Sequence, residues 1–396
     1  MTNAGDPDDT IGQAHNVVAR SAPGGSAPGR PERTLRIAML APPWIPVPPP
    51  GYGGIEEVVA LLCDALVARG HDVELFCAPG SQSTAKVRPL LPRPHPEAIE
   101  RSLFEADHVG LAFAEIDEGG GSETPFDVVH DHCGSTPLAM ADRLTVPLAH
   151  TVHGPFDDDT GVFYAHHSRK GTVVCISHSQ AGMAPGDAEV AGVVHNPIDV
   201  DAWPVGVHKQ DYLLWLGRIV PEKGPQRAIR VARLAKRPLV LAGNVQPRYE
   251  RFFATEVEPH IDGETVRYVG EVGGARKQQL FADAYAFLMP IRWPEPFGMV
   301  MVESLAAGTP VLAFDQGAAP EIVENGRNGF LVHDEEQMAA AVEPAGRLDP
   351  MECRRSAERF APDRVAARYE GMYEVAIAAG RGRGRPPRAA GAPVGI

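Results

Sequence analysis

The stretch of sequence that decides the fold of this chain carries two glutamates eight positions apart and reads Glu295-Pro-Phe-Gly-Met-Val-Met-Val-Glu303, then Ser304-Leu-Ala-Ala-Gly-Thr-Pro-Val311. Pro296 favours an extended conformation of the residue before it and suits the first position of a helix. At the other end, Gly308 can cap that helix and Pro310 cannot continue it. The stretch therefore predicts a short helix that begins beside one carboxylate and carries the other.

Both carboxylates are expected to reach one pocket at the N-terminus of this helix. Glu303 lies on the helix, where long side chains lean back toward the N-terminus, and Glu295 lies in the loop just before it. The free N–H groups at a helix N-terminus attract anions. Acceptors for sugar hydroxyls beside a diphosphate site are what the binding of a nucleotide sugar requires. The alternative is two exposed acids on an ordinary amphipathic helix.

The whole string resembles the E-x7-E signature of the family 4 retaining glycosyltransferases. The resemblance extends over about residues 35–380 and implies the GT-B fold, an α/β architecture of two Rossmann-like doubly wound domains that face a cleft. It also implies the transfer of a hexose from a nucleoside-diphosphate sugar to an acceptor hydroxyl, and family frequency favours UDP-glucose as the donor. Family precedent implies same-face attack, in which the leaving phosphate oxygen takes the acceptor proton.

Composition narrows the class of protein. The chain has 396 residues, 44% of them hydrophobic, which is enough for two or three domains. A formal net charge of −14 argues against a nucleic-acid partner. The five cysteines form no metal-ligand spacing, which favours a reducing compartment. Because neither a signal peptide nor an apolar run long enough to span a bilayer is present, we expect a cytoplasmic protein.

The chain is expected to consist of two domains between two tails. Residues 1–33 are rich in Gly, Pro, Ala and Ser and are expected to be disordered. Residues 381–396 form a disordered basic tail that we expect to be solvated, with peripheral contact to anionic lipid as the alternative. Between the tails we expect an N-terminal Rossmann-like acceptor domain (34–195), a linker (196–205) and a C-terminal Rossmann-like nucleotide-sugar donor domain (206–361). The resemblance places a final helix (362–380) back against the first domain.

Alternating apolar runs predict two series of strands and helices, and hence two parallel sheets. Neither first strand is followed by G-x-G-x-x-G, which weakens an interpretation as an NAD or FAD enzyme. In the first series the expected strands are 35–40, 73–77, 128–130, 147–152, 173–176 and 193–195, with a helix at 55–69 and Ser177 as a helix N-cap. In the second series the expected strands are 212–216, 239–242, 266–268, 286–289 and 311–314, with helices at 226–234 and 278–284 and the final helix near 363–379.

A second motif, Leu216-Gly-Arg-Ile-Val-Pro-Glu-Lys-Gly224, follows a predicted strand and precedes a predicted helix. Arg218 and Lys223 are thus expected at the C-terminal edge of the sheet, where open α/β sheets bind ligands. Arginine can fork onto phosphate oxygens and lysine adds a point charge, so the two can stabilise a leaving diphosphate. The pattern resembles the diphosphate-binding segment of the family, with Gly217 also binding the donor. An exposed turn with two surface cations is the alternative.

A loop rich in proline and glycine, residues 42–56, precedes the first long helix. It resembles the first glycine-rich loop of the family, which lies near the donor phosphates and the acceptor, and its glycines allow close backbone approach. We therefore expect Gly53 and Gly54 to bind the donor and Tyr52 to lie on the acceptor side. A purely structural loop is the alternative. Further along, Gly317 is expected to bring the backbone close to the nucleotide, and Glu321 is expected to begin a helix.

Histidines end two of the predicted strands. In the family, a histidine at the place of His153 faces the donor sugar and the acceptor, so His153 is a candidate catalytic residue; a hydrogen-bonded core histidine is the alternative. His130-Asp-His132 ends another strand, and we expect His132 to line the acceptor side or to be structural. This triplet lacks the separated further ligand that a metal site needs, so we expect no metal and no cofactor.

The resemblance assigns the remaining roles. Glu295, Arg218, Lys223 and His153 would be catalytic, because Glu295 would hold hydroxyls of the donor sugar and the two cations would neutralise the diphosphate. Glu303 would accept hydrogen bonds from the ribose. Two rival functions stay open: a GT-B nucleotide-sugar epimerase and a non-catalytic sugar-nucleotide-binding subunit. The other donor-binding residues lie at the helix start and are Phe297, Gly298, Met299 and Val300.

Overall fold

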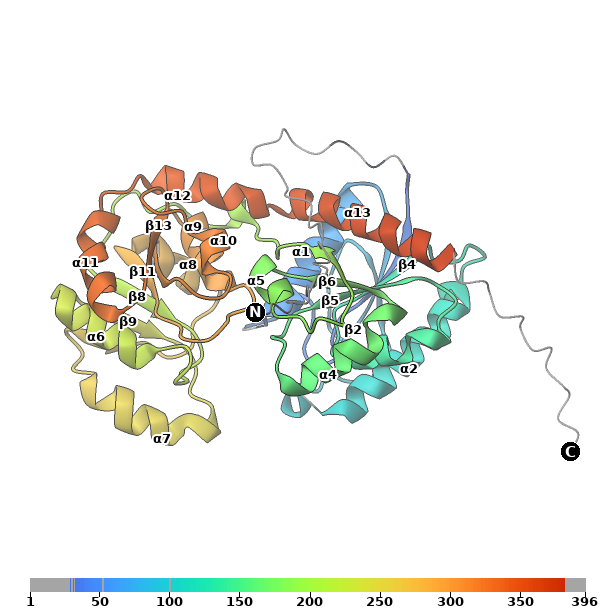
Figure 1. Cartoon of the computed structure of the whole chain (residues 1–396), viewed down its shortest axis with the longest axis horizontal. Coiled ribbons are helices and arrows are strands. Elements are labelled where there is room, and N and C mark those ends of the chain that lie inside the picture. Colours follow the sequence, from blue (N-terminus) through green and yellow to red (C-terminus); the bar gives the residue numbers. More distant parts are fainter. Residues whose placement is uncertain (1–28, 30, 32, 52, 100, 382–396) are drawn as a thin grey trace, which may run out of the picture.

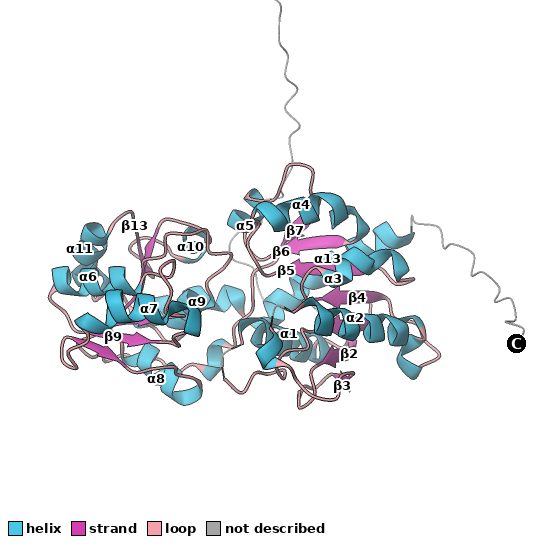
Figure 2. Cartoon of the chain, turned by 90° about the horizontal axis from the view of Figure 1, so that it is seen from below, coloured by secondary structure: helices cyan, strands magenta, loops and turns pink. Residues whose placement is uncertain are grey.

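The computed structural model describes residues 29, 31, 33–51, 53–99 and 101–381 and shows two α/β domains side by side (Figure 1). Figure 2 shows the same arrangement from below. Each domain is built on a parallel sheet with helices on both faces, which confirms the expected α/β architecture. Apart from positions 29, 31, 33 and 381, the two expected disordered tails lie outside the described residues, and so does Tyr52.

The sheet of the first domain has seven parallel strands in the order β3-β2-β1-β4-β5-β6-β7. The order reverses between β1 and β4, which makes the sheet doubly wound. Alternate residues of β1 enter opposite cores, with Ile37 and Met39 on one face and Ala38 and Leu40 on the other. The strands are β1 (Arg36–Leu40), β2 (Asp72–Cys77), β3 (Lys86–Pro89), β4 (Val128–Asp131), β5 (Leu148–Val152), β6 (Thr172–Cys175) and β7 (Val190–Val193).

Helices cover both faces of this first sheet. Helix α1 packs with the last helix of the chain on one face, and α2, α3 and α4 cover the other. The Ser177 hydroxyl accepts a hydrogen bond from the Gln180 N–H at 2.9 Å and caps α5, which confirms the predicted N-cap. The helices are α1 (Gly54–Ala68), α2 (Ser102–Asp117), α3 (Thr136–Met140), α4 (Asp158–His167) and α5 (His178–Gly182).

The second domain has six parallel strands in the order β10-β9-β8-β11-β12-β13, which reverses between β8 and β11. Helices α6 and α11 cover one face, and α8, α9 and α12 cover the other. The strands are β8 (Leu213–Leu216), β9 (Leu239–Ala242), β10 (Val266–Tyr268), β11 (Ala286–Met289), β12 (Val311–Phe314) and β13 (Gly329–Val332). The helices are α6 (Pro225–Ala235), α7 (Glu250–Phe252), α8 (Gly274–Asp283), α9 (Met299–Ala306), α10 (Ala319–Ile322), α11 (Glu335–Ala345) and α12 (Pro350–Ala357).

The last helix, α13 (Pro362–Arg381), joins the core of the first domain although it follows the second domain in sequence (Figure 1). Its Tyr369 and Tyr373 are buried, and the helix contacts α1, β4, β5 and β6. The chain therefore crosses between the domains twice. The N–H of Ile198 in the first crossing donates to the carbonyl of Phe360 in the second at 2.9 Å, which ties the crossings together.

Several predicted ends of elements differ from the structure. The helix expected at 278–284 is α8, which begins at Gly274, and two further differences have a clear cause. The strand expected at 193–195 is β7, which ends at Val193, because His195 turns toward Glu321 of the second domain. Pro296 is not the first helical residue. Helix α9 begins three residues later, after Gly298, whose left-handed φ of +84° turns the chain before the helix starts.

The far end of α9 is closed as the sequence predicts. Gly308 has a φ of +73°, and its N–H donates to the carbonyl of Leu305 at 2.9 Å. The N–H of Thr309 donates to the carbonyl of Ser304, also at 2.9 Å. These two bonds form a Schellman cap. Both ends of α9 are thus set by a glycine in the left-handed conformation.

The topology gathers the sequence motifs at two sheet edges. Because all strands within a sheet are parallel, the segments that follow them lie at the same edge. The motif segments follow β1, β4 and β5 in the first domain and β8, β11 and β12 in the second. In each domain they therefore lie at the C-terminal edge of the sheet.

Candidate functional site

Glu295 lies in the loop between β11 and α9 and is held by two donors. Its Oε2 atom pairs with the Nζ atom of Lys223 and accepts a hydrogen bond from the indole N–H of Trp293 at 2.7 Å. The Trp293 ring centroid lies 5.1 Å from Lys223 Nζ, within the range of a cation–π contact. The structure therefore brings two residues singled out from the sequence, Glu295 and Lys223, into direct contact.

The backbone of Glu295 is fixed by the segment that follows β12. Its carbonyl accepts a hydrogen bond from the N–H of Ala318 at 3.1 Å. A Cβ atom on Gly317 would lie 2.6 Å from the Glu295 nitrogen, and the φ of Gly317 is +57°, so glycine is required there. Gly317 thus makes its close approach to the backbone of the Glu295 loop. Its approach to a nucleotide stays a prediction.

Glu303 lies on α9 and is only 8% exposed. Its Oε1 atom accepts a hydrogen bond from Lys277 Nζ at 2.6 Å. Its Oε2 atom is buried and has no hydrogen-bond partner among the described residues. Leaving a buried carboxylate oxygen unpaired is destabilising, so Oε2 is an acceptor that a bound hydroxyl group would satisfy.

The start of α9 offers main-chain donors instead of side chains. The Phe297 side chain is buried, and its ring lies 5.7 Å from the His195 ring and 5.6 Å from the Phe360 ring. Met299 and Val300 are the first two helical residues, so their N–H groups have no partner inside the helix. These N–H groups and the positive end of the helix dipole point toward an anion-binding role for this turn.

Arg218 is half-buried and lines a small pocket at the C-terminal edge of the second sheet. The N–H of Gly217 donates to the carbonyl of Ala242 at 3.0 Å. A Cβ atom on Gly243 would lie 1.7 Å from the carbonyl oxygen of Gly217, so the two segments pack backbone to backbone. The pocket is formed by the segments after β8, β9 and β10 and is lined by Leu216, Gly217, Arg218, Gly243, Asn244, Glu271 and Val272.

Arg227 ties two loops of the site together, a role that sequence analysis missed. Its Nε atom donates to the carbonyl of Pro290 at 2.6 Å, and its Nη2 atom donates to the carbonyls of Pro221 at 3.1 Å and Glu222 at 2.8 Å. The first carbonyl belongs to the loop before α9, and the other two belong to the loop between β8 and α6. Lys277 was missed as well. Pro290, the partner through which Arg227 reaches the other loop, and Glu303, the partner of Lys277, are both distant in sequence, so no spacing could have revealed these contacts.

His153 and His132 form a hydrogen-bonded pair at the ends of β5 and β4. The Nε2 atom of His153 lies 2.8 Å from Nδ1 of His132. His153 is half-buried, whereas His132 is fully buried, which favours the structural alternative for His132. Burial, helped by the nearby His150, lowers the pKa of His153 to about 3, and burial also lowers the pKa of His132. Both rings are therefore neutral near pH 7, and one donates to the other.

The histidine layer beneath this pair is tied to α13. Nδ1 of His130 lies 2.8 Å from the Tyr373 hydroxyl, and Nε2 lies 2.9 Å from the Thr151 hydroxyl. That hydroxyl lies 3.0 Å from the hydroxyl of Tyr369. The rings of His130 and His132 are 4.2 Å apart. The last helix of the chain thus supports the histidines of the first domain.

The start of α1 carries the two glycines, Gly53 and Gly54, that are predicted to bind the donor. A Cβ atom on Gly53 would lie 2.7 Å from side chains of its own loop, whereas one on Gly54, the first residue of α1, would meet nothing within 4 Å. Burial raises the pKa of Glu57, the charge of Glu303 raises it further, and Lys277 opposes this rise. The charges of Glu303 and Lys277 in the second domain thus act on Glu57 in the first.

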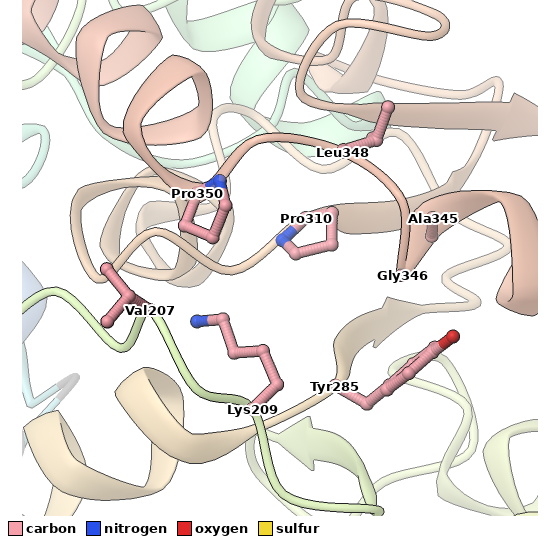
Figure 3. A pocket seen from close by; sticks show the side chains of 8 residues that line it. All are labelled: Val207, Lys209, Tyr285, Pro310, Ala345, Gly346, Leu348 and Pro350. Atoms are coloured by element: carbon pink, nitrogen blue, oxygen red, sulfur yellow. The ribbon is translucent and has the colours of Figure 1, made fainter.

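Other features of the chain lie apart from this site. The pocket in Figure 3 is lined by residues that precede β11 and β12, such as Tyr285 and Pro310, and lies at the opposite edge of the second sheet. Within the described part of the chain, no group of three or more His, Cys, Asp or Glu residues could hold a metal ion. Among the residues that the structure describes, no helix is long and apolar enough to cross a membrane.

Comparison with known protein families decides what this architecture is. The family described as Glycosyltransferase Family 4 matches residues 52–202, and the family described as Glycosyl transferases group 1 matches residues 201–357. The two matches meet in the first crossing between the domains. This chain belongs to the family 4 glycosyltransferases with the GT-B fold.

Three relatives support the same class of enzyme. The structure of AviGT4, a glycosyltransferase involved in avilamycin A biosynthesis, matches with 29% identity and a TM-score of 0.66 and covers 87% of this chain and 98% of AviGT4. D-inositol 3-phosphate glycosyltransferase of Streptomyces scabiei is 27% identical over 393 residues, which cover 82% of this chain and 86% of the relative. Glycogen synthase of Mycobacterium tuberculosis is 27% identical over 410 residues, with coverage of 89% and 97%. These relatives confirm the prediction from the E-x7-E motif that this chain is a glycosyltransferase enzyme.

The packing of Gly243 gives a prediction about stability. Gly243→Ala would force a Cβ atom into the Gly217 carbonyl at a position whose φ is +150°, so we expect the free energy of unfolding to fall by ~1–3 kcal/mol. Gly186→Ala is the matched control, because its Cβ atom would meet nothing within 4 Å and Gly186 has no positive φ. Urea unfolding followed by circular dichroism measures both. Equal stability of the two variants would contradict the prediction.

Proposed function

We propose that this glycosyltransferase moves a hexose from a nucleoside-diphosphate sugar to an acceptor hydroxyl and retains the anomeric configuration. UDP-glucose is the first donor to test, because family frequency favours it. In this proposal the donor lies on the second domain and the acceptor approaches beside His153 of the first. The reaction needs no metal ion and takes place in the cytoplasm.

The observation that carries the proposal is the unpaired Oε2 atom of Glu303. Lys277 holds the other oxygen of this carboxylate, so Oε2 has a fixed position on the helix that offers its N-terminus to anions. A purely structural glutamate would have both oxygens paired or exposed to water. A ribose hydroxyl donating to Oε2 would remove this unfavourable state.

Positive charge and main-chain donors gather where a diphosphate would lie. Arg218 and Lys223 come from the loop after β8, and α9 begins with free N–H groups. Together they would stabilise the charge that grows on the diphosphate as the sugar departs. Glu295, oriented by Lys223 and Trp293, would bind hydroxyls of the donor sugar.

His153 would meet the donor sugar from the first domain. Because its ring is neutral, it would form a hydrogen bond with a sugar hydroxyl and would not protonate the leaving group. Same-face attack then leaves the acceptor proton to the departing phosphate oxygen. Proton NMR of the product shows the configuration at the anomeric carbon, and an inverted centre would reject this mechanism.

A donor screen tests the proposal as a whole. UDP-, GDP- and ADP-sugars are offered with a panel of hydroxyl acceptors, and release of free nucleoside diphosphate is measured together with the glycosylated acceptor. Transfer gives both products in equal amounts. An epimerised sugar nucleotide without a glycosylated acceptor would reject the proposal, and so would the absence of turnover with every donor.

Loss of either diphosphate-binding cation should slow the transfer. We expect Arg218→Ala and Lys223→Ala each to reduce turnover at saturating donor by ~10²-fold, as for other donors to a developing negative charge. Arg233→Ala, on the exposed face of α6, is the matched control and should keep the turnover of the parent. A cation variant with normal turnover would remove that residue from the mechanism.

The two glutamates should divide the donor between them. We expect Glu303→Ala to weaken binding of the free nucleoside diphosphate by ~1.5–3 kcal/mol, because its carboxylate would make charged hydrogen bonds to the ribose. Glu295→Gln should weaken binding of the intact sugar donor and have little effect on the free nucleotide. Isothermal titration calorimetry with both ligands measures the split. Equal losses for both ligands in both variants would show that the roles are not divided.

Transfer should not depend on a divalent metal, because two cations and a helix N-terminus already serve the diphosphate. We expect turnover in excess EDTA to match turnover in untreated buffer. The assay is repeated after addition of Mn²⁺ or Mg²⁺. Complete loss in EDTA followed by recovery with Mn²⁺ would show that the enzyme uses a metal.

A further inference from the structure

Glu321, on α10 of the second domain, bonds to the backbone of the first domain. Its Oε2 atom accepts a hydrogen bond from the N–H of His178 at 2.9 Å, and its Oε1 atom accepts one from the N–H of Ser179 at 2.8 Å. These residues begin α5, and their N–H groups have no partner inside that helix. The carboxylate therefore caps a helix of the other domain, with only 16% of its side chain exposed.

A third bond to Glu321 comes from His195, where the chain leaves the first domain. The Nε2 atom of His195 lies 2.9 Å from Oε2 of Glu321. Burial alone would raise the pKa of Glu321, but the hydrogen bonds from His195 and from two backbone N–H groups lower it below its ordinary value. Glu321 is thus an ionised carboxylate with three charge-assisted bonds: two to the first domain, and one to His195, where the chain leaves that domain.

The same contacts lead to the loop that carries Glu295. Residues 317–318, just before α10, pack on the backbone of Glu295 and bond to its carbonyl. On the other side, the ring of Phe297 lies 5.7 Å from the ring of His195. The Glu295 loop is therefore connected to Glu321 by two short paths, and a shift of the first domain would reach the loop through both.

We infer that Glu321 is a positioning residue that sets the placement of the first domain against the Glu295 loop, and that sugar transfer depends on this placement. The inference rests on the proposed function, in which the second domain holds the nucleotide and His153 reaches the sugar from the first. Removing the Glu321 contact should then slow transfer and leave nucleotide binding intact. A residue needed only for folding would not separate these two quantities.

Glu321→Gln tests the inference, with Glu324→Gln as the matched control. Glutamine keeps one acceptor oxygen but turns an N–H₂ group toward one of the two N–H donors of α5, so at least one of the two backbone bonds is lost, together with the negative charge that strengthens the others. Glu324 lies three residues further on and pairs with Arg327 at 2.7 Å and Arg359 at 2.9 Å. At saturating donor we expect turnover to fall ~10²-fold in E321Q and less than about twofold in E324Q. The affinity for UDP, measured by calorimetry, should be that of the parent in both variants.

Small-angle X-ray scattering of the same proteins without ligand gives a readout that does not depend on turnover. Loss of the bond between the domains should increase the radius of gyration of E321Q, whereas E324Q should match the parent. A parent that transfers no sugar would reject the proposed function, and the scattering would still decide the role of Glu321. Parental turnover or a parental radius in E321Q would overturn the inference, as would a loss of UDP affinity equal to the loss of turnover.

His195→Phe removes the bond between His195 and Glu321 by changing the other partner, and it is the variant to measure if E321Q does not fold. Phenylalanine keeps a ring against Phe297 and Phe360 but removes the bond to Glu321. We expect a smaller loss of turnover in the same direction, with UDP affinity unchanged. If E321Q folds, the loss in the double variant should be less than the sum of the single losses, because both changes break one contact. An H195F protein with parental turnover, or fully additive losses, would overturn the coupling.

Discussion

The packing of Gly317 against the backbone of Glu295 is the contact on which the candidate site depends. Only a glycine lets the two backbones approach so closely at that left-handed position. With the backbone fixed, Ala318 bonds to the Glu295 carbonyl, and Lys223 and Trp293 reach its carboxylate from one side. The site is therefore organised around one anchored loop, and its charged side chains take their positions from that backbone.

The two domains bring different chemistry to the same place. The second domain supplies ion pairs, a half-satisfied carboxylate and a helix N-terminus, all of which act through charge. The first supplies His153, whose neutral ring is bonded to the neutral, buried ring of His132. Because neutral rings contribute little attraction for a diphosphate, the proposed recognition of the donor depends on the charged groups of the second domain, and the rings of the first domain would complete the site. The geometry between the halves then decides whether the groups act together.

The sequence predicts an element well where a single local preference, such as a continuous apolar run, determines it. It predicts poorly where two local preferences conflict or where a contact joins residues far apart in the chain. Strands β9 and β11 are continuous apolar runs, buried on both faces, and their bounds agree with the prediction. The start of α9 was mispredicted because Pro296 suits a first helical position while Gly298 turns the chain after it. Strand β3 was missed because a charged edge strand has no apolar pattern. The motifs named Glu303 as a site residue, but only the fold could reveal Lys277 beside it, since no sequence spacing relates the two.

The position of α13 affects the order in which the protein is made. A ribosome completes the strands of the first domain and then the whole second domain before the helix that closes the first core leaves the exit tunnel. At ~5–20 residues per second, the first sheet waits roughly 10 to 30 seconds with one part of its core uncovered. His130 meets Tyr369 and Tyr373 only after the whole second domain has been translated. The second domain is continuous in sequence and can fold during this interval, so the domain that is begun first is completed last.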